Sequence, residues 1–287
     1  ISLDDKFENF QDKYYGIGFQ LISQPFQFLI EDFVQTYQKV DAAGSHLLAK
    51  HFVIFLSFFI SGIFFYLIVF IITNNANFST ASTILYLLYP YLLGHAFFNP
   101  KDIPFLSFWI ICTYLSINLF NNVLENVKIN YFQLLIFSFI TSFLLSIRIS
   151  GILIFLQYII TFIIYITVSN ENLLTFIKKF YKKFLFFIVT LILFTILLYP
   201  IYWKNPLLIF SAINYMSNYF NDVCTLTLGK CMEAKNLDPT YIPIWILVKL
   251  PFIIILGLLL LPFTEKKILT TKRNKISFGT LISIIFL

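Results

Sequence analysis

Long apolar runs separated by short polar segments occupy most of the chain from residue 52 onward. Each run has the length and composition of a helix that crosses about 30 Å of hydrocarbon, with tilt or local thinning of the bilayer absorbing small differences. The pattern therefore predicts an all-α polytopic membrane protein, a transmembrane helix bundle with external loops. The predicted spans lie near residues 52–73, 80–98, 104–121, 132–147, 151–168, 184–200 and 242–263, with an eighth beginning near 276.

The first fifty residues have a different pattern, in which acids, bases, glutamines and aromatic residues are mixed. Between Phe19 and Tyr37, apolar residues recur at helical spacing, which predicts an amphipathic helix on the membrane surface or across the end of the bundle. Pro25 would start or kink this helix. The chain thus divides into a first external loop with an acidic motif (1–51) and a set of transmembrane helices (52–200). A second external loop (201–241) and further transmembrane helices (242–287) follow.

Composition supports a membrane environment. Apolar residues make up 59% of the 287 residues and charged residues only 12%, about half the usual share in soluble domains. The mean hydropathy is +0.84. The net charge of +6 comes from basic residues in particular loops, and no arginine–aromatic patch or RNA-binding motif accompanies it. We therefore interpret the positive charge as a signal of topology and expect no nucleic-acid partner.

The basic residues predict which way the spans run. If the spans alternate, the three loops 122–131, 169–183 and 264–275 fall on one side, and two of them contain short clusters of lysine and arginine. Short loops rich in Lys and Arg mark the cytoplasmic side. The opposite side then holds residues 1–50, the turn at 99–102, Arg148 and the long 201–241 loop.

Both ends of the sequence have the features of internal segments. The chain begins at Ile1 without an initiator methionine or signal peptide, and it stops at Leu287 within a new apolar run. We expect it to be the central part of a longer protein, with at least one helix before it and the remainder of one after it.

Candidate catalytic groups lie on the predicted external side. Asp4 and Asp5 are adjacent acids that can act as a general base or hold a cation, although solvated loop charge or helix capping is the more frequent role of such a pair. Lys101 and Asp102 lie in a turn bracketed by Pro100 and Pro104, which stiffens the backbone near the bilayer surface. The alternative for this turn is a helix end with snorkelling charges.

Two further cations are candidates for binding an anion. Arg148 is isolated between two apolar runs, and a guanidinium binds phosphate through paired hydrogen bonds. Its alternative role is to cap the C-terminus of a helix. Lys249 lies about two turns inside an apolar run, where it either snorkels outward or meets an anion.

Histidine and cysteine spacings predict no metal site. The three histidines and three cysteines lack the spacing of zinc ligands, and a divalent metal is without support from the sequence. Cys224 and Cys231 lie in the predicted external loop, where a small disulfide loop can form, whereas Cys112 lies within a span. The absence of Walker, GxSxG and HExxH motifs argues against a nucleotide-driven pump or a metalloprotease.

The order of several short motifs resembles the GT-C superfamily of membrane glycosyltransferases, especially its protein O-mannosyltransferase and aminoarabinose-transferase branch. The motifs, from the acidic pair to the last aromatic cluster, are residues 2–7, 45–51, 94–105, 148–151, 202–206 and 241–245. The turn Asn99-Pro100-Lys101-Asp102 is the most specific of them. The family's acidic motif is usually Asp-Glu, and this chain has Asp-Asp at positions 4 and 5.

The resemblance implies a polyprenyl-phosphate-sugar donor, a protein, lipid or glycan acceptor, and an inverting displacement on the non-cytoplasmic side of a bacterial inner membrane or an endoplasmic reticulum membrane. It implies that Asp4 is the general base, with Asp5 beside it and Asp102 as the second acid of the site. Lys101 and Arg148 would face the lipid-linked phosphate, and Lys249 is a further candidate for it.

A transporter or flippase of a lipid-linked or anionic solute is the alternative function. Such a protein would use Arg148 and Lys249 as binding charges and would show inverted repeats or Gly/Pro-broken helices in corresponding positions. We find no such repeat in the sequence. A purely structural membrane anchor is a third interpretation, but it leaves the 99–104 turn unexplained.

Overall fold

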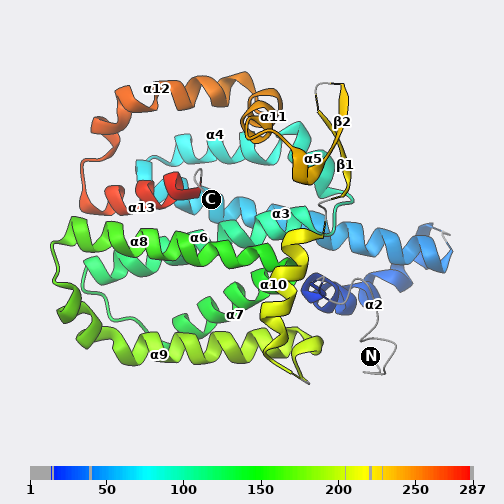
Figure 1. The fold of residues 1–287 in the computed structure, drawn as a ribbon, viewed down its shortest axis with the longest axis horizontal. Coiled ribbons are helices and arrows are strands. Elements are labelled where there is room, and N and C mark those ends of the chain that lie inside the picture. Colours follow the sequence, from blue (N-terminus) through cyan, green and yellow to red (C-terminus); the bar gives the residue numbers. More distant parts are fainter. Residues whose placement is uncertain are drawn as a thin grey trace.

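The computed structural model describes residues 14, 16–38, 41–203, 205–219, 222–227 and 229–284. Helices form nearly all of this part of the chain, and β1 and β2 form a two-stranded antiparallel sheet (Figure 1). The elements are α2 (Gly18–Gln38), α3 (Ala42–Thr73), α4 (Ala76–Leu87), α5 (Pro90–Ala96), α6 (Asp102–Leu124), α7 (Tyr131–Ile147), η1 (Ile149–Leu153), α8 (Ile154–Ser169), α9 (Leu173–Leu198), η2 (Pro200–Trp203), α10 (Leu208–Asn218), β1 (Cys224–Thr227), β2 (Lys230–Glu233), η3 (Ala234–Asn236), α11 (Tyr241–Lys249), α12 (Phe252–Ile268) and α13 (Lys272–Ser283).

The all-α fold is confirmed, and it is compatible with an integral membrane protein. Four helical segments of the described chain are long and apolar enough to cross a membrane, namely Ala43–Thr73, Asp102–Leu124, Ile149–Ser169 and Leu173–Leu198. A fifth span is possible if α11 and α12 are taken together. These segments are fewer than the eight that the hydropathy pattern predicts.

Two of the predicted spans are each divided at a proline. The 80–98 run forms α4 and α5, which are separated just before Pro90, and the 242–263 run forms α11 and α12, which meet at 111° around Pro251. Proline lacks the N–H that a continuing helix needs and disfavours helical backbone in the preceding residue. A third predicted span, 132–147, is the 17-residue helix α7.

The long helices run roughly parallel, and successive connections alternate between the two ends of the bundle (Figure 1). We call the end with residues 74–75, 125–130, 170–172 and 269–271 the basic end. The opposite end, which we call the site end, has α2, residues 97–101, Arg148 and the segment from η2 to α11. The predicted basic loop 169–183 is shorter than expected because α9 begins at Leu173, so its lysines lie on the helix.

Asparagines shape the turns at the basic end. Asn74, Asn126 and Asn170 have positive φ angles of 49°, 56° and 59°. Asparagine tolerates this left-handed conformation better than most residues, so it ends a helix without the strain that a branched residue would cause. At the start of α7, the side chains of Asn130 and Gln133 form a capping box with the backbone.

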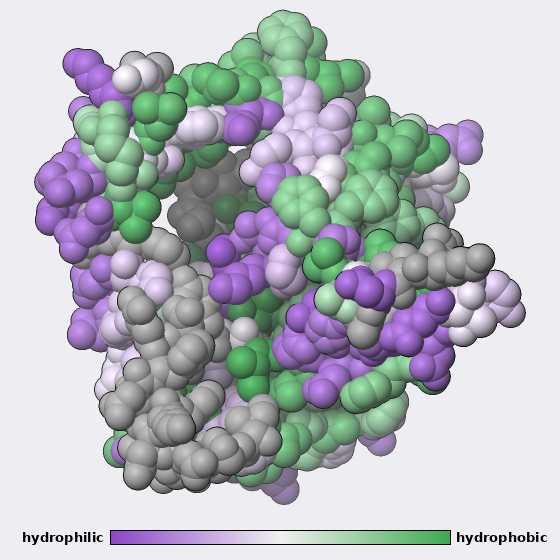
Figure 2. Space-filling model, turned by 90° about the vertical axis from the view of Figure 1, so that its right-hand side faces the viewer, coloured by the Kyte–Doolittle hydropathy of each residue, from purple (hydrophilic) through white to green (hydrophobic). Residues whose placement is uncertain are grey.

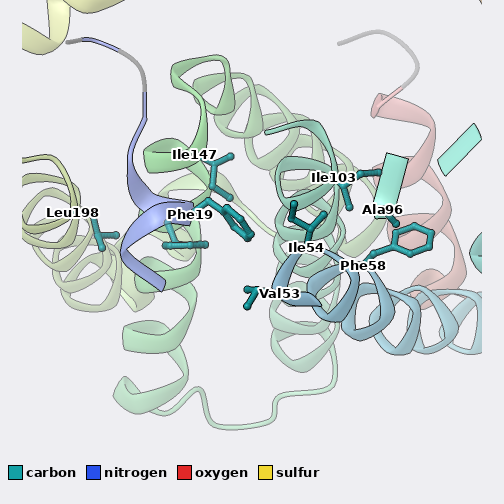
Figure 3. Packing of buried hydrophobic residues seen from close by; sticks show 9 residues of the cluster. Phe19, Val53, Ile54, Phe58, Ala96, Ile103, Ile147 and Leu198 are labelled. Carbon is teal, nitrogen blue, oxygen red and sulfur yellow. The ribbon is translucent and has the colours of Figure 1, made fainter. Parts of the chain in front are cut away.

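A hydrophobic core lies directly beneath the site end (Figure 3). Phe58 of α3 is buried there, and so are Ile103 of α6 and Ile147 of α7. The other buried members of the cluster are Phe19, Val53, Ile54, Ala96, Phe143 and Leu198. Because Ile103 and Ile147 directly adjoin Asp102 and Arg148 in sequence, this packing fixes the backbone from which both charged side chains extend.

Small and polar residues join the helices elsewhere in the bundle. Gln157 of α8 donates to Thr113 Oγ1 of α6 at 3.1 Å and to the Thr280 carbonyl of α13 at 3.4 Å. Asn121 of α6 donates to Ser277 Oγ of α13 at 3.1 Å. Interhelical hydrogen bonds and small residues are the usual means of association where lipid removes most of the hydrophobic driving force.

The predicted amphipathic helix is present as α2, with Pro25 inside it. It packs against α3 and α7. The stripe formed by Phe26, Leu29, Phe33 and Tyr37 is exposed, as a helix lying in a membrane surface requires. In the second predicted external loop, the disulfide between Cys224 and Cys231 is confirmed and closes the β1–β2 hairpin, while Cys112 is a buried free thiol.

Candidate functional site

The turn between α5 and α6 is organised by the side chain of Asn99. Its Oδ1 accepts hydrogen bonds from the backbone N–H groups of Lys101 at 3.1 Å and Asp102 at 2.9 Å. These donors belong to the start of α6, where backbone N–H groups have no partner within the helix. Asn99 therefore caps α6 and sets the direction in which its first residue, Asp102, leaves the backbone.

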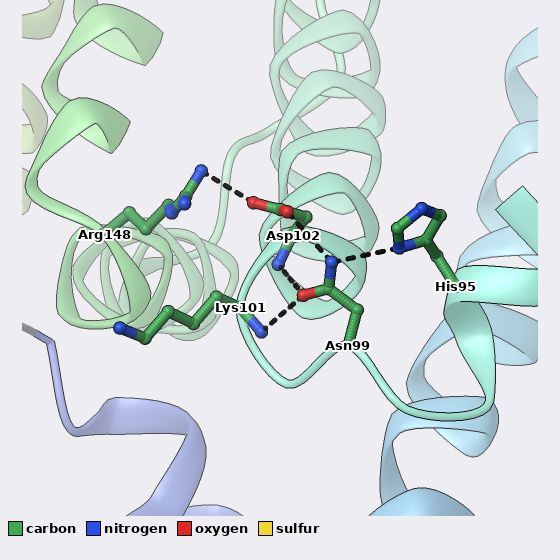
Figure 4. Close-up of polar contacts among 5 residues, drawn as sticks. All are labelled: His95, Asn99, Lys101, Asp102 and Arg148. Carbon is green, nitrogen blue, oxygen red and sulfur yellow. Dashed lines mark hydrogen bonds and ion pairs between the residues drawn. The ribbon is translucent and has the colours of Figure 1, made fainter. Parts of the chain in front are cut away.

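The other end of the same amide holds two side chains in place (Figure 4). Asn99 Nδ2 donates to Asp102 Oδ2 at 2.9 Å and to His95 Nδ1 at 3.2 Å. One asparagine thus connects the last turn of α5 with the first residue of α6.

Asp102 also forms an ion pair with Arg148. Its Oδ1 lies 2.7 Å from Arg148 Nη1, and the two side chains are 55% and 41% exposed. Arg148 follows the last residue of α7 and has an extended backbone, with φ −145° and ψ 135°. The structure therefore brings together two of the residues that the sequence singles out, and both remain accessible to a ligand from the site end.

Lys101 lies beside this ion pair on the same turn. Figure 4 shows its side chain extending toward the side of the turn where Arg148 lies. Lys101, Asp102 and Arg148 place two cationic side chains and one carboxylate in a single cluster. This combination attracts an anion and still offers an oxygen that can accept a proton.

Aromatic contacts connect the cluster with Lys249. The rings of His95 and Tyr91 have centroids 4.6 Å apart, and Lys249 Nζ lies 5.1 Å from the centre of the Tyr91 ring and 5.0 Å from that of Trp245. Tyr89 Oη donates to the Lys249 carbonyl at 2.6 Å. Lys249 is the last residue of α11, at the bend before α12, and not the interior of one continuous span as predicted.

The segment before α2 packs against the end of α7 next to Arg148. A Cβ atom on Gly16 or Gly18 would overlap the backbone or side chain of Ser146, so only glycine allows this approach. Tyr199 Oη donates to the Leu145 carbonyl at 2.8 Å in the same region. Burial raises the pKa of the neighbouring Tyr202 to about 12, so its phenol stays neutral near pH 7.

Asp4 and Asp5 lie outside the described residues, so the first acidic motif has no structural account. Tyr91, Gly16 and Tyr199 contribute to the site but do not stand out in the sequence, and Asn99 stands out there only as part of the 99–102 motif, without a role of its own. An asparagine three residues before Asp102, at the start of an apolar run, is a recognisable helix cap and would have indicated Asn99. Nowhere in the described chain do three or more His, Cys, Asp or Glu residues gather as metal ligands.

Figure 2 shows the site end, where polar and apolar surfaces lie side by side. No protein-family model, curated protein sequence or solved structure matches the chain.

Proposed function

We propose that this chain is the membrane part of a GT-C-type glycosyltransferase, which transfers a sugar from a polyprenyl-phosphate donor to an acceptor at the site end. The ion pair of Asp102 and Arg148 beside Lys101 is the observation that carries the proposal. A phosphate-linked donor needs cations next to its phosphate, and the acceptor needs a carboxylate next to its hydroxyl or amine. This turn has both within one cluster.

In the proposed reaction, an acceptor oxygen or nitrogen attacks the anomeric carbon and forms the new glycosidic bond. The bond from that carbon to the phosphate oxygen breaks, and its electron pair leaves with the polyprenyl phosphate. A carboxylate takes the acceptor proton, for which Asp4 is the proposed general base and Asp102 the second acid. Arg148 and Lys101 stabilise the negative charge that grows on the leaving phosphate.

The sidedness of the proposal rests on two features. The disulfide at the site end suits an oxidising compartment, and the short clusters of lysine at the other end suit the cytoplasm. We propose that the site end faces the periplasm or the lumen of the endoplasmic reticulum. The exposed apolar residues along the long helices would face lipid and the donor's isoprenoid tail.

A transporter or flippase is the second candidate, because the structure has two helices broken at prolines. The α4–α5 and α11–α12 breaks lie side by side, joined by the hydrogen bond from Tyr89 to the Lys249 carbonyl. Broken helices that meet at a charged residue are typical of transporter binding sites. Here Lys249 would bind the anionic solute.

The test uses the full-length protein in membranes and a radiolabelled polyprenyl-phosphate sugar. Asp102→Asn and Asp4→Asn should each reduce transfer by about 10²- to 10⁴-fold, the usual range for a lost acid or base. Asp32→Asn, on the exposed side of α2, is the matched control and should keep full transfer. Each variant must first reach the membrane in wild-type amounts. Full transfer in both site variants would refute the proposal, and movement of the labelled lipid without transfer would favour the flippase.

A further inference from the structure

The first turns of α9 have an unusual concentration of positive charge. Lys178, Lys179, Lys182 and Lys183 lie within six residues, and all of them are exposed or half-buried. At 3.6 residues per turn they share an arc of about 140° on one side of the helix. The surface of α9 at the basic end is therefore a continuous basic strip, which we call the lysine strip.

The acids at this end have other partners. Tyr165 donates to Glu171 at 2.7 Å, and Arg273 lies 3.4 Å from Glu125. These are the two acidic side chains described at the basic end, and no ion pair joins either of them to the lysine strip in the described part of the chain. Three of the lysines instead lie over aromatic rings of their own helix, at 5.1 to 5.9 Å from the ring centres. The charge of the strip is not neutralised by the described residues.

Apolar side chains lie beside the strip on the same turns. Leu174, Ile177, Tyr181 and Phe184 are exposed and occupy an arc of about 80° next to the lysines. The helix has 26 residues and is about 39 Å long, so it exceeds the hydrocarbon core of about 30 Å. Its first turns therefore reach the headgroup layer, where lysines meet phosphate groups and the apolar stripe meets the acyl chains.

We infer that the lysine strip of α9 is a binding site for anionic phospholipid headgroups. The occupant is a bilayer lipid and not a soluble anion, because the strip is continuous with the apolar surface of the same helix. Lysines next to a membrane span attract anionic lipids through their charge, and the gain adds up over a cluster of this size. The inference does not depend on the proposed glycosyltransferase activity.

The experiment measures the association of spin-labelled phosphatidylglycerol and spin-labelled phosphatidylcholine with the full-length protein reconstituted in phosphatidylcholine bilayers. The wild type should prefer the anionic lipid, and the variant K178Q/K179Q/K182Q/K183Q should lose roughly fivefold or more of that preference. The variant K178R/K179R/K182R/K183R keeps the charge and should keep the preference. Lys230→Gln, on β2 at the site end, is the control for loss of a distant charge.

Salt supplies a second readout that needs no variant. Raising the salt to 1 M shortens the screening length to about 3 Å, so the wild-type preference should fall toward that of the glutamine variant. A preference that survives both the glutamine substitutions and high salt would overturn the inference. So would an equal loss of preference in the arginine variant, because that result would trace the effect to altered packing.

Discussion

Asn99 combines structural and chemical roles in a single side chain. Its Oδ1 caps α6, and its Nδ2 fixes the carboxylate of Asp102 and the ring of His95. An uncharged residue therefore decides where the charged groups of the site point. From residue type alone, the neighbouring charged residues are the more obvious candidates for a functional role than the asparagine.

Replacing Asn99 separates these roles. Asn99→Ala removes the cap and should lower the free energy of unfolding by about 1 kcal/mol, the usual cost of losing an N-cap. Asn99→Asp keeps the acceptor for the backbone but places a second carboxylate next to Asp102, so it should keep most of the stability and still impair sugar transfer. Unfolding in detergent and the transfer assay measure the two effects. Equal losses of stability in both variants would argue against the cap.

The site was predictable in part. Asp102, Lys101 and Arg148 stand out in sequence because charges next to apolar runs are costly and need a reason. Their ion pair was not predictable, because it depends on how α6 and α7 pack over Ile103 and Ile147. The bend after Lys249 was not predicted, because the apolar run through Pro251 conceals it.

At the scale of elements, hydropathy predicts where helices form better than where they break. The runs at 80–98 and 242–263 are predominantly apolar, so their average hydropathy hides the prolines that divide them. α13 has the opposite character, because polar residues fill its first turns and hydrogen bonds hold it to α6 and α8. A helix of this kind needs partners before it is stable in a bundle.

A substitution of Gln157 tests whether α13 depends on hydrogen bonds to its neighbouring helices. Gln157→Leu has a similar volume but loses the hydrogen bonds to Thr113 and the Thr280 carbonyl, so the free energy of unfolding should fall by about 1 kcal/mol, within the range measured for such bonds in membranes. Thr161→Val is the matched control, because Thr161 donates only to the Gln157 carbonyl of its own helix among the described contacts. Reversible unfolding in mixed detergent micelles measures both. Equal losses would show that α13 does not depend on Gln157.

The β1–β2 hairpin and the turn after it should be stable over a defined range of pH. Hydrogen bonds to Asp222 and Glu233 raise the pKa of Lys235. The contribution of Lys235 to the stability of this segment is therefore full below the ordinary lysine pKa, and it is lost as the pH rises through the pKa of the folded state. Backbone and side-chain hydrogen bonds from Thr240 lower the pKa of Asp238. The contribution of Asp238 to the stability of this segment is therefore full above the ordinary aspartate pKa, and it is lost as the pH falls through the pKa of the folded state. Amide exchange in this segment, corrected for intrinsic rates, should stay constant between about pH 5 and 9. Asp238→Asn should remove the acid limb alone.

At the scale of the whole molecule, the alternating connections and the charge pattern describe the same arrangement. The four lysines of the lysine strip lie at the basic end of the bundle, while the disulfide and the cluster of Asp102 and Arg148 lie at the site end. The charges of the loops in sequence predict this separation. The end at which a loop lies depends only on how many times the chain crosses the bundle before it. The two broken helices do not disturb it, since each still carries the chain from one end to the other.

The cysteines offer a direct test of this arrangement. Cys224 and Cys231 are joined at the site end and Cys112 is buried in α6, so a membrane-impermeant maleimide should label none of the three cysteines in sealed vesicles under oxidising conditions. An impermeant reductant should make two thiols reactive, and only in vesicles whose site end faces outward. Lys178→Cys, in a chain that otherwise keeps its cysteines, adds a thiol on the lysine strip that should react only in vesicles of the opposite orientation. Labelling of both positions from the same side would show that the spans do not alternate, and the proposed separation of the donor site from the anionic-lipid site would then fail.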